Sequence, residues 1–430
     1  MDYIAQGSAT EELTHEQLEL LVDELLVRLG SLKRVLLIPP DHTRSHSYAG
    51  ELTSMLYHRL SKNAEIKILP ALGTHSPMTS GQIAAMFQDI PLDRFLVHNW
   101  RTDLHKLGEV PADFIDGITG KRLRYPIHCE INRTLLEGKW DRIISIGQVV
   151  PHEVVGMANH SKNVFVGTGG SDTIHKTHYV GAVCGMENVM GRAQSPVREI
   201  LNYMSTYFGA SLPLVYLLTV RGHNSHGALV TRGVFAGDDE TCFAKAAQLS
   251  QEVNLDLLDE PLQKVVVYLA PDEFKSTWLG NKAIYRTRMA MANDGELMII
   301  APGVREFGED SGIDHLIRKY GYHGTEHTLQ AVEKNSDLGS NLAAAAHLIH
   351  GSSEGRFRVT YCPGKLSRAE IEGVGFSYAN CDELLKRYSP ARLRDGINFL
   401  PGGEQVFFIS NPALGLWGLK SQFSRAMAGV

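Results

Sequence analysis

Short apolar segments that alternate with amphipathic ones constrain the fold of this chain more than any other feature. Residues 34–38, 65–69, 95–98 and 143–146 are short, apolar and bounded by polar or turn residues, which is typical of buried strands. Residues 10–29 and 48–61 carry leucines at helical spacing. Polar clusters follow most of the predicted strands. This alternation predicts an α/β fold with largely parallel sheets and helices on both faces.

The second half of the chain repeats the pattern. Strands are predicted at 265–270, 297–301, 357–362 and 405–410, with helices between them. A chain of 430 residues is too long for one core, so we expect two α/β domains with an active-site cleft between them. The predicted boundaries are 1–268 for the N-terminal domain, with 400–430 returning to it, and 269–399 for the C-terminal domain.

Composition excludes several classes of protein. The net charge is −6 without a basic block, so we expect no nucleic-acid partner. No apolar run reaches the roughly 18 residues of a membrane span, and the N-terminus lacks a secretory pattern. The five cysteines are scattered and include no C-x-x-C pair. We therefore expect reduced thiols, a cytoplasmic location and no membrane partner.

The stretch from Gly147 to His178 holds the densest group of reactive side chains. His152 follows the predicted strand 141–147, at the place where open α/β sheets bind ligands. Lys162 and His178 come later in the same stretch. Between them, a turn that includes Gly169 and Gly170 has the composition of a phosphate cradle, although short glycine turns are common. The chain has neither a Walker loop nor a G-x-G-x-x-G fingerprint.

Two further polar loops follow predicted strands. Asp41 and Arg44 lie in D-H-T-R, where Asp is a helix cap and Arg suits a carboxylate or phosphate. His75 lies in G-T-H-S-P. A lone loop histidine is usually a surface residue, but His75 and His152 at separate strand ends form a candidate acid–base pair. The spacing from His152 to His178 matches no standard zinc motif.

Taken in order, D-H-T-R at 41–44, G-T-H-S-P at 73–77, P-H at 151–152, Lys162 and His178 resemble the lactate racemase family, which uses a nickel-pincer nucleotide. The resemblance covers most of the chain, and only the ordered set is specific. It implies a pyridinium mononucleotide with nickel held by two sulfurs and a ring carbon. Lys162 maps onto its covalent attachment point and His178 onto the fourth nickel ligand, a sensible donor for nickel(II).

The resemblance also implies roles for the remaining candidates. His75 and His152 map onto two opposed acid–base residues, and Arg44 maps onto the substrate-carboxylate clamp. Asp41, together with Gly169 and Gly170, falls in the cofactor-contact region. The implied reaction oxidises a 2-hydroxy acid at C2 by proton-coupled hydride transfer and returns the hydride to the other face. Separate cofactor-biosynthesis enzymes are implied as maturation partners.

Departures from the family pattern bear on the substrate. Asn159, His160 and Ser161 precede Lys162, where the family tends to show S-G-G-x. W-L-G-N-K, from Trp278 to Lys282, stands where the family has Tyr-Gln-x-x-Lys. Trp278 and Lys282 are therefore candidates for substrate binding, although a solvated helix Lys is the simpler interpretation of Lys282. We expect a lactate-like acid or, equally, a larger sugar acid such as an aldonate.

Two other classes of function stay open. A mononuclear metal-dependent hydrolase would use His75, His152 and His178 with Asp41. A non-catalytic two-lobed protein that binds a sugar acid or a metal would close on its ligand without turnover.

Overall fold

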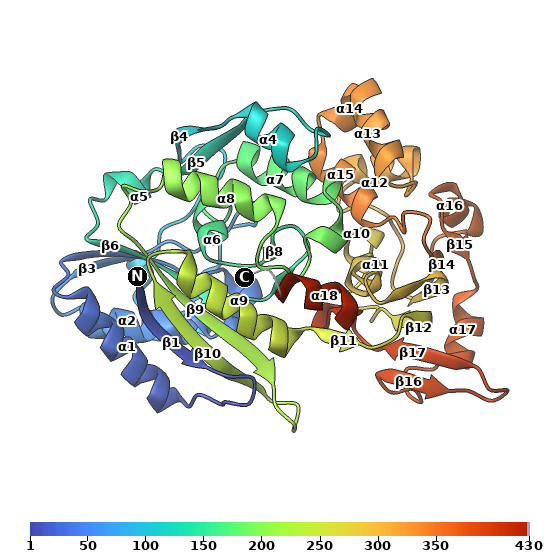
Figure 1. The fold of residues 1–430 in the computed structure, drawn as a ribbon, viewed down its shortest axis with the longest axis horizontal. Coiled ribbons are helices and arrows are strands. Elements are labelled where there is room, and N and C mark those ends of the chain that lie inside the picture. Colours follow the sequence, from blue (N-terminus) through green and yellow to red (C-terminus); the bar gives the residue numbers. More distant parts are fainter. Residues whose placement is uncertain (428–430) are drawn as a thin grey trace. The chain divides into compact units, whose positions relative to one another are not determined.

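The computed structural model describes residues 1–427 and divides into two compact units (Figure 1). The first unit comprises Met1–Cys184 and Asn188–Asn254, and the second comprises Gly185–Glu187 and the chain from Leu255 onward. Both units are built around a six-stranded sheet. The predicted α/β class with largely parallel sheets is confirmed.

The sheet of the first unit has the strand order β1-β10-β9-β6-β2-β3. The pairs β9–β6, β6–β2 and β2–β3 are parallel, and the two pairs at the β1 end are antiparallel. The carboxyl ends of β6, β2 and β3 therefore lie at one edge. The strands are β1 (Asp2–Gly7), β2 (Arg34–Ile38), β3 (Glu65–Ile68), β6 (Arg142–Gln148), β9 (Leu214–His223) and β10 (Leu229–Gly237).

Helices cover both faces of this sheet. Leucines of α1 and α2 pack with alternate strand residues such as Leu37 and Ile144 in one buried core. On the opposite face, Asn163 of α6 donates to Ile38 O and Ser145 Oγ. The helices of the unit are α1 (His15–Leu29), α2 (Ala49–Leu60), α3 (Ser80–Phe87), α4 (Ala112–Ile118), α5 (Thr134–Glu137), α6 (Ser161–Phe165), α7 (Ser171–Val183), α8 (Pro196–Tyr207) and α9 (Glu240–Asn254).

Short elements complete the first unit. A 3₁₀ helix, η1, spans His42–Ser47 after β2. Asp41 is its N-cap, and the Asp41 carboxylate accepts a hydrogen bond from the Thr43 amide. Two hairpins join β4 (Leu104–Val110) to β5 (Ile127–Asn132) and β7 (Pro151–His152) to β8 (Gly156–Met157).

The sheet of the second unit has the order β15-β14-β13-β12-β17-β16, and every pair except β16–β17 is parallel. Val266, Ile300 and Phe408 lie in a core on one of its faces. Its strands are β12 (Leu262–Tyr268), β13 (Met291–Ala301), β14 (Arg358–Pro363), β15 (Ser377–Tyr378), β16 (Gly396–Phe399) and β17 (Gln405–Ile409). Two further strands, β11 (Asp256–Leu258) and β18 (Trp417–Leu419), form a separate two-stranded parallel sheet.

Helices connect these strands. The first two, α10 and α11, are short. The helices are α10 (Thr277–Gly280), α11 (Lys282–Thr287), α12 (Ser311–Tyr320), α13 (Thr325–Lys334), α14 (Ser336–Gly339), α15 (Leu342–His350), α16 (Arg368–Gly373), α17 (Cys381–Arg387) and α18 (Lys420–Met427).

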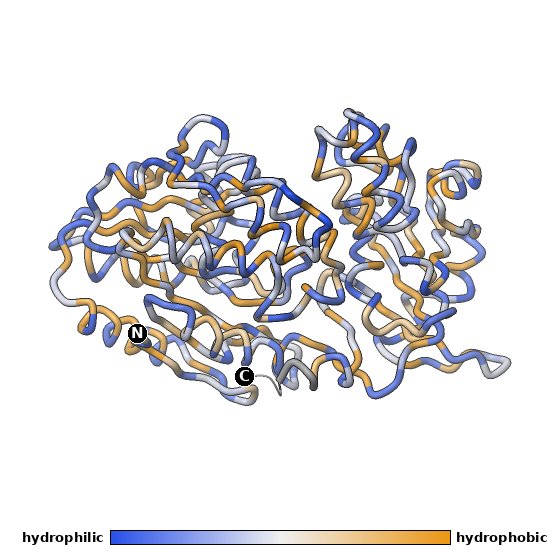
Figure 2. Tube along the Cα trace, turned by 45° about the horizontal axis from the view of Figure 1, so that its top comes forward, coloured by the Kyte–Doolittle hydropathy of each residue, from blue (hydrophilic) through white to orange (hydrophobic). Residues whose placement is uncertain are grey.

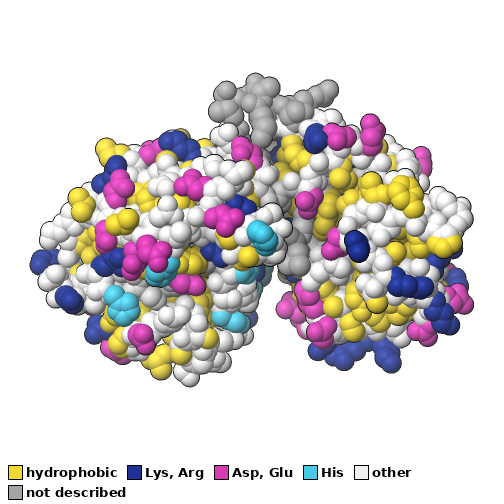
Figure 3. All heavy atoms as spheres, turned by 90° about the horizontal axis from the view of Figure 1, so that it is seen from below, with side chains coloured by type: hydrophobic (Ala, Val, Ile, Leu, Met, Phe, Trp, Pro, Cys, Tyr) yellow, Lys and Arg dark blue, Asp and Glu magenta, His cyan; other side chains and the backbone are white. Residues whose placement is uncertain are grey.

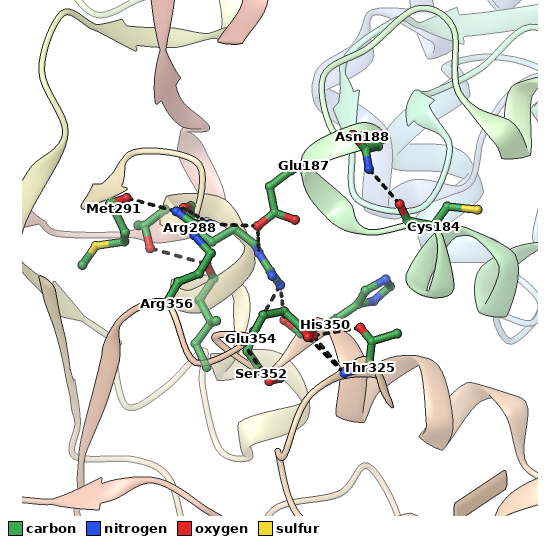
Figure 4. Close-up of polar contacts among 12 residues, drawn as sticks. Cys184, Glu187, Asn188, Arg288, Met291, Thr325, His350, Ser352, Glu354 and Arg356 are labelled. Atoms are coloured by element: carbon green, nitrogen blue, oxygen red, sulfur yellow. Dashed lines mark hydrogen bonds and ion pairs between the residues drawn. The ribbon is translucent and has the colours of Figure 1, made fainter. Parts of the chain in front are cut away.

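The crossover segment Gly185–Glu187 belongs to the second unit because Glu187 is bonded there. Its carboxylate accepts from Arg288 Nε at 2.8 Å and Arg356 Nη1 at 3.0 Å, and Figure 4 shows both guanidinium groups turned toward it. Arg288 is only 2% exposed. A buried cation of this kind needs a partner, which Glu187 provides.

The structure differs from the sequence expectations at three points. The first unit ends at Asn254 rather than 268, because β12 already pairs with β13 and β17 of the second unit. Residues 405–409 do not return to the first unit, since β17 lies beside β12. Residues 95–98 form no strand; only an isolated bridge joins Ile68 to Phe95.

The hydropathy of the chain alternates, and its surface carries charges of both signs. Hydrophobic and hydrophilic segments alternate along the trace in Figure 2, and among residues 1–427 no helix is long and apolar enough to cross a membrane. Acidic and basic side chains lie interspersed on the face drawn in Figure 3.

Candidate active site

The carboxyl edge of the first sheet gathers the sequence candidates. Asp41 follows β2, His75 follows β3, and His152 follows β6, and these three strands are parallel neighbours. Helices α6 and α7 add Lys162 and His178. Electrostatic interactions join Arg44, His152, Lys162 and His178 to one another, which places all four in one charged neighbourhood.

Asp41 orients His75. His75 Nδ1 lies 2.5 Å from Asp41 Oδ2, while the other carboxylate oxygen accepts from the amide and hydroxyl of Thr43. Burial acts to raise the pKa of Asp41, but the bonds from His75 and Thr43 outweigh it and leave that pKa below its ordinary value. The carboxylate therefore holds a proton on His75 Nδ1, and the side chain, 55% exposed, presents Nε2 as the free ring nitrogen.

His152 is held in the opposite tautomer. The backbone N–H of Val154 donates to His152 Nδ1 at 3.1 Å, so the neutral ring carries its proton on Nε2. Burial, and then the charge of Lys162, hold the pKa of His152 well below its usual value. The two histidines thus offer unlike groups, a basic Nε2 on His75 and an Nε2–H on His152.

Lys162 lies half-buried near the start of α6. Burial and the nearby charge of Arg44 lower the pKa of its ammonium to about 8, against the opposing effect of Glu153. A pKa near 8 leaves a larger neutral fraction of Lys162 near neutral pH than an ordinary lysine has. Lys162 is therefore a nucleophilic amine near neutral pH.

His178 is arranged as a metal ligand would be. Its Nδ1 donates to the Ile174 carbonyl one turn earlier in α7, at 2.6 Å, which leaves the lone pair on Nε2. Burial and the charge of Lys162 lower its pKa to about 4, so the ring is neutral at physiological pH. A backbone carbonyl that fixes the tautomer is the usual support of a metal-binding histidine.

Arg44 lies exposed on η1, with non-helical backbone angles of φ −116° and ψ 28°. Its Nη1 is 3.4 Å from the Thr43 carbonyl, and among the described residues no carboxylate pairs with it. Its planar fork is thus available to an anionic ligand.

The glycine turn before α7 has a packing explanation. A Cβ on Gly169 would lie 1.9 Å from the Phe165 carbonyl oxygen, and one on Gly170 would lie 2.2 Å from Glu130 Oε2. The Gly169 carbonyl accepts from buried His98 at 3.1 Å. The backbone contact accounts for Gly169, whereas the neighbours of Gly170 are movable side-chain ends, Glu130 Oε2 and Leu104 Cδ1. A phosphate-binding role for the turn stays a prediction.

Trp278 and Lys282 lie in the second unit. Trp278, on α10, packs its ring against His347 with centroids 4.4 Å apart, and His347 Nε2 in turn contacts the Tyr322 hydroxyl at 3.0 Å. Lys282 is the half-buried first residue of α11. Their roles in substrate binding stay predictions.

Two residues in the first unit were missed by sequence reasoning. Glu153 opposes the pKa lowering of His152, Lys162 and His178, so it is the common counter-charge of the neighbourhood. Its position next to His152 is the sequence signal that points to it. Arg198, on α8, contacts the turn before Lys162, and nothing in the local sequence marks it.

The described residues contain no group of three or more His, Cys, Asp or Glu side chains arranged around a metal position. His178 as the one protein donor of a metal whose other donors come from a bound molecule stays a prediction. The set does not fit a hydrolase metal centre, which takes three protein ligands in its common forms.

Comparisons with known proteins bear on the family of the N-terminal part and on the fold. Residues 10–191 match the family described as the lactate racemase N-terminal domain. A crystal structure of a Thermotoga maritima protein superposes with a TM-score of 0.77 at 23% identity, covering 97% of this chain and 100% of that one.

The lactate racemase apoprotein from Thermoanaerobacterium thermosaccharolyticum is similar as well. It superposes with a TM-score of 0.67 at 16% identity, covering 96% of this chain and 94% of that one. At these identities the likeness concerns the fold. A comparison with curated protein sequences gives no match.

Proposed function

We propose, from the match of residues 10–191 to the lactate racemase N-terminal domain, that the protein inverts C2 of a 2-hydroxy acid. The observation that carries the proposal is the pair of histidines after β3 and β6, the two strands that flank β2, held in opposite tautomers. Lys162 and His178 share the electrostatic neighbourhood of His152. A racemase that works on both enantiomers needs a proton-transfer group on each side of the substrate.

The residues fit the nickel-pincer nucleotide of this family. Lys162 offers a buried amine that is partly neutral near pH 7.5, which suits covalent attachment. His178 offers a neutral imidazole with a free Nε2, which suits nickel(II) beside sulfur donors. The cofactor, when bound, would supply the hydride acceptor that lets C2 be oxidised and reduced again.

The chain's own residues would then bind, orient and move protons. His75 Nε2 would take the hydroxyl proton of one enantiomer, and Asp41 would stabilise the resulting imidazolium through Nδ1–H. His152 Nε2–H would donate a hydrogen bond to the oxygen on the other side. To supply the hydroxyl proton of the product, His152 would first have to take up a proton from solvent at Nδ1, and to act as the base it would have to carry its proton on Nδ1 instead of Nε2. Both changes would break the Val154 contact, so His75 and His152 would begin the reaction in different protonation states.

Arg44 is the proposed clamp for the substrate carboxylate, because its guanidinium has no ion-pair partner among the described residues. The substrate proposal covers lactate-like acids and sugar acids such as aldonates, with Trp278 and Lys282 as further contacts. The cleft between two domains, maturation by cofactor-biosynthesis enzymes and a cytoplasmic location also stay predictions.

The test is inversion by protein produced together with the cofactor-biosynthesis enzymes. A panel of 2-hydroxy acids and aldonic acids, labelled with deuterium at C2, is incubated and analysed by chiral chromatography and mass spectrometry. Hydride transfer predicts an inverted product that keeps the deuterium. Inversion with loss of deuterium to water would instead mean deprotonation at carbon, and inactivity of loaded protein on the whole panel contradicts the proposal.

No observation favours the alternatives to the same degree. A hydrolase would need a three-ligand metal site, and the described residues contain none. A purely binding protein would have no use for two histidines of opposite tautomer, although turnover by the loaded protein is what separates the two classes.

A further inference from the structure

The turn that precedes Lys162 is held in an unusual conformation. Asn159 and His160 both have positive φ, at 69° and 59°. Asn tolerates the left-handed region, but His160 combines its φ with a ψ of −134°, a pair of backbone angles that residues other than glycine rarely adopt. Such a conformation persists only where its surroundings fix it.

Arg198 fixes the turn from one side. It lies on α8 and is 2% exposed. Its Nη2 donates to the Met157 carbonyl at 2.6 Å and to the Asn159 carbonyl at 3.3 Å, while Nη1 donates to Ser161 Oγ at 2.9 Å. The guanidinium also lies over the Phe243 ring, 4.1 Å from its centroid. Among the described residues no carboxylate pairs with this buried cation.

His160 and Asn163 fix the two ends of the same segment. The His160 ring packs on Tyr216 with centroids 3.7 Å apart, and its Nε2 donates to the Asp239 carbonyl at 3.1 Å. Asn163 Nδ2 donates to the Ile38 carbonyl, at the end of β2, and to Ser145 of β6. Lys162 therefore lies between a turn that Arg198 and His160 hold by hydrogen bonds and a residue, Asn163, that is bonded to β2 and β6.

We propose that Arg198 is a positioning residue for Lys162: by donating to three residues of the turn, it holds the left-handed step that presents the Lys162 amine at the sheet edge. The proposal rests on the proposed function only in making Lys162 the attachment point. A buried Arg with no carboxylate partner is costly, and its contacts go to backbone and hydroxyl oxygens of this one turn.

Arg198 acts on the charge of Lys162 as well as on its place. It is one of the cations that lower the pKa of Lys162, after burial and Arg44. Two substitutions separate the hydrogen bonds of Arg198 from its charge. Arg198→Lys keeps the positive charge but cannot bond three residues of the turn at once, whereas Arg198→Met removes both the charge and the hydrogen bonds.

The experiment compares Arg198→Lys, Arg198→Met and Arg232→Met. Arg232 is a control in the same unit: it is 6% exposed and donates to the Glu11 and His223 carbonyls, each at 2.9 Å, and unlike Arg198 it also pairs with a carboxylate, Glu12 Oε1 at 3.6 Å. Hydrogen exchange of the peptide 157–166 reports the turn. Acetylation by acetic anhydride over a range of pH, in which the amine displaces acetate, reports Lys162 relative to exposed Lys62. Intact mass of protein matured with the cofactor reports attachment.

Exchange in 157–166 should rise about tenfold in both Arg198 variants and stay unchanged in Arg232→Met. The pH midpoint for Lys162 acetylation should rise in Arg198→Met, making the reaction about threefold slower below the midpoint, and stay in place in Arg198→Lys. The fraction of protein with adduct should fall in both.

Equal exchange in Arg198→Met and Arg232→Met, with an unchanged acetylation profile, would overturn the proposal and leave Arg198 a general core residue. Exchange and acetylation are read on protein without cofactor, so they decide the role of Arg198 even if wild-type protein carries no adduct. Wild-type protein without an adduct after maturation would count against the proposed function and not against the role of Arg198.

Discussion

At the scale of residues, the sequence names the reactive groups but not their states. Asp41 is expected to contact a cofactor, whereas in the structure its carboxylate accepts from His75 and Thr43. Nothing in D-H-T-R and G-T-H-S-P tells that these two loops meet, because the contact depends on β2 and β3 being parallel neighbours. Glu153 and Arg198 were missed for the same reason: their effect depends on burial and on distant partners.

Asp41→Asn should show whether Asp41 supports His75 in catalysis or only stabilises the fold as the cap of η1. The amide can still accept from the Thr43 N–H, so the cap of η1 survives at a cost below about 1 kcal/mol. It cannot stabilise a His75 imidazolium as a carboxylate does, and we expect kcat for inversion to fall at least about tenfold. Steady-state kinetics on loaded protein measure this, and an unchanged kcat contradicts the orienting role.

The same substitution tests a pH dependence. The pKa of Asp41 is lower in the folded protein, so its stabilisation is present above the unfolded pKa and is lost as pH falls through the folded value. Thermal melts of wild type and Asp41→Asn from pH 7 down to pH 3 should therefore converge at the acid end. Parallel curves over that range contradict the pKa direction.

The tautomers of His75 and His152 are open to direct observation. In ¹⁵N-histidine spectra of the cofactor-free protein, with His75→Gln and His152→Gln for assignment, neutral His75 should be protonated at Nδ1 and His152 at Nε2. Because its pKa is lowered, His152 should also stay neutral at pH 6. A His152 signal that titrates at its ordinary pKa contradicts this account.

At the scale of elements, the apolar periodicity located β2, β3 and β6 of the first sheet and β12, β13, β14 and β17 of the second, since buried parallel strands are short continuous apolar runs. It failed where pairing is decided by distant chain segments. β1 was not predicted, and it forms only by pairing with β10. Residues 95–98 have the composition of a strand, yet only Phe95 reaches a partner.

Helix α7 provides a matched pair of histidines for testing the nickel ligand. His178→Ala should reduce nickel retained by matured, dialysed protein, because Nε2 of His178 is the proposed protein donor. His175→Ala removes a half-buried imidazole from the same helix, whose ring instead lies edge-on to Trp100. Inductively coupled plasma mass spectrometry should find a loss only in His178→Ala. Equal retention in both variants argues against His178 as the ligand.

At the scale of the whole molecule, the two α/β units follow from chain length and the repeated strand–helix pattern, but their limits do not. Apolar residues 405–409 would fit either sheet, and the pairing of Val265 with Phe407 is what assigns them to the second. The segment Gly185–Glu187 could not be assigned from sequence, because its place depends on Arg288 and Arg356.

Glu187→Gln should destabilise the second unit. The variant leaves buried Arg288 without its charged partner, and since Glu187 is 32% exposed we expect a loss of about 1–3 kcal/mol, less than for a fully buried pair. Urea unfolding is followed by hydrogen exchange of peptides from each unit. The unfolding midpoint of β12–β14 should fall to a lower urea concentration than in the wild type, and the midpoint of β2 and β6 should not change. An unchanged midpoint would show that the Arg288 contact is not stabilising.

The central claim is that Lys162 and His178 together hold a nickel-bearing cofactor, and the most direct measurement is intact mass with metal content. Protein matured with the cofactor-biosynthesis enzymes should gain mass on the peptide that contains Lys162 and carry about one nickel per chain. Lys162→Ala should abolish the mass gain. An unmodified Lys162 peptide in fully matured protein, or an adduct retained by Lys162→Ala, would contradict the account.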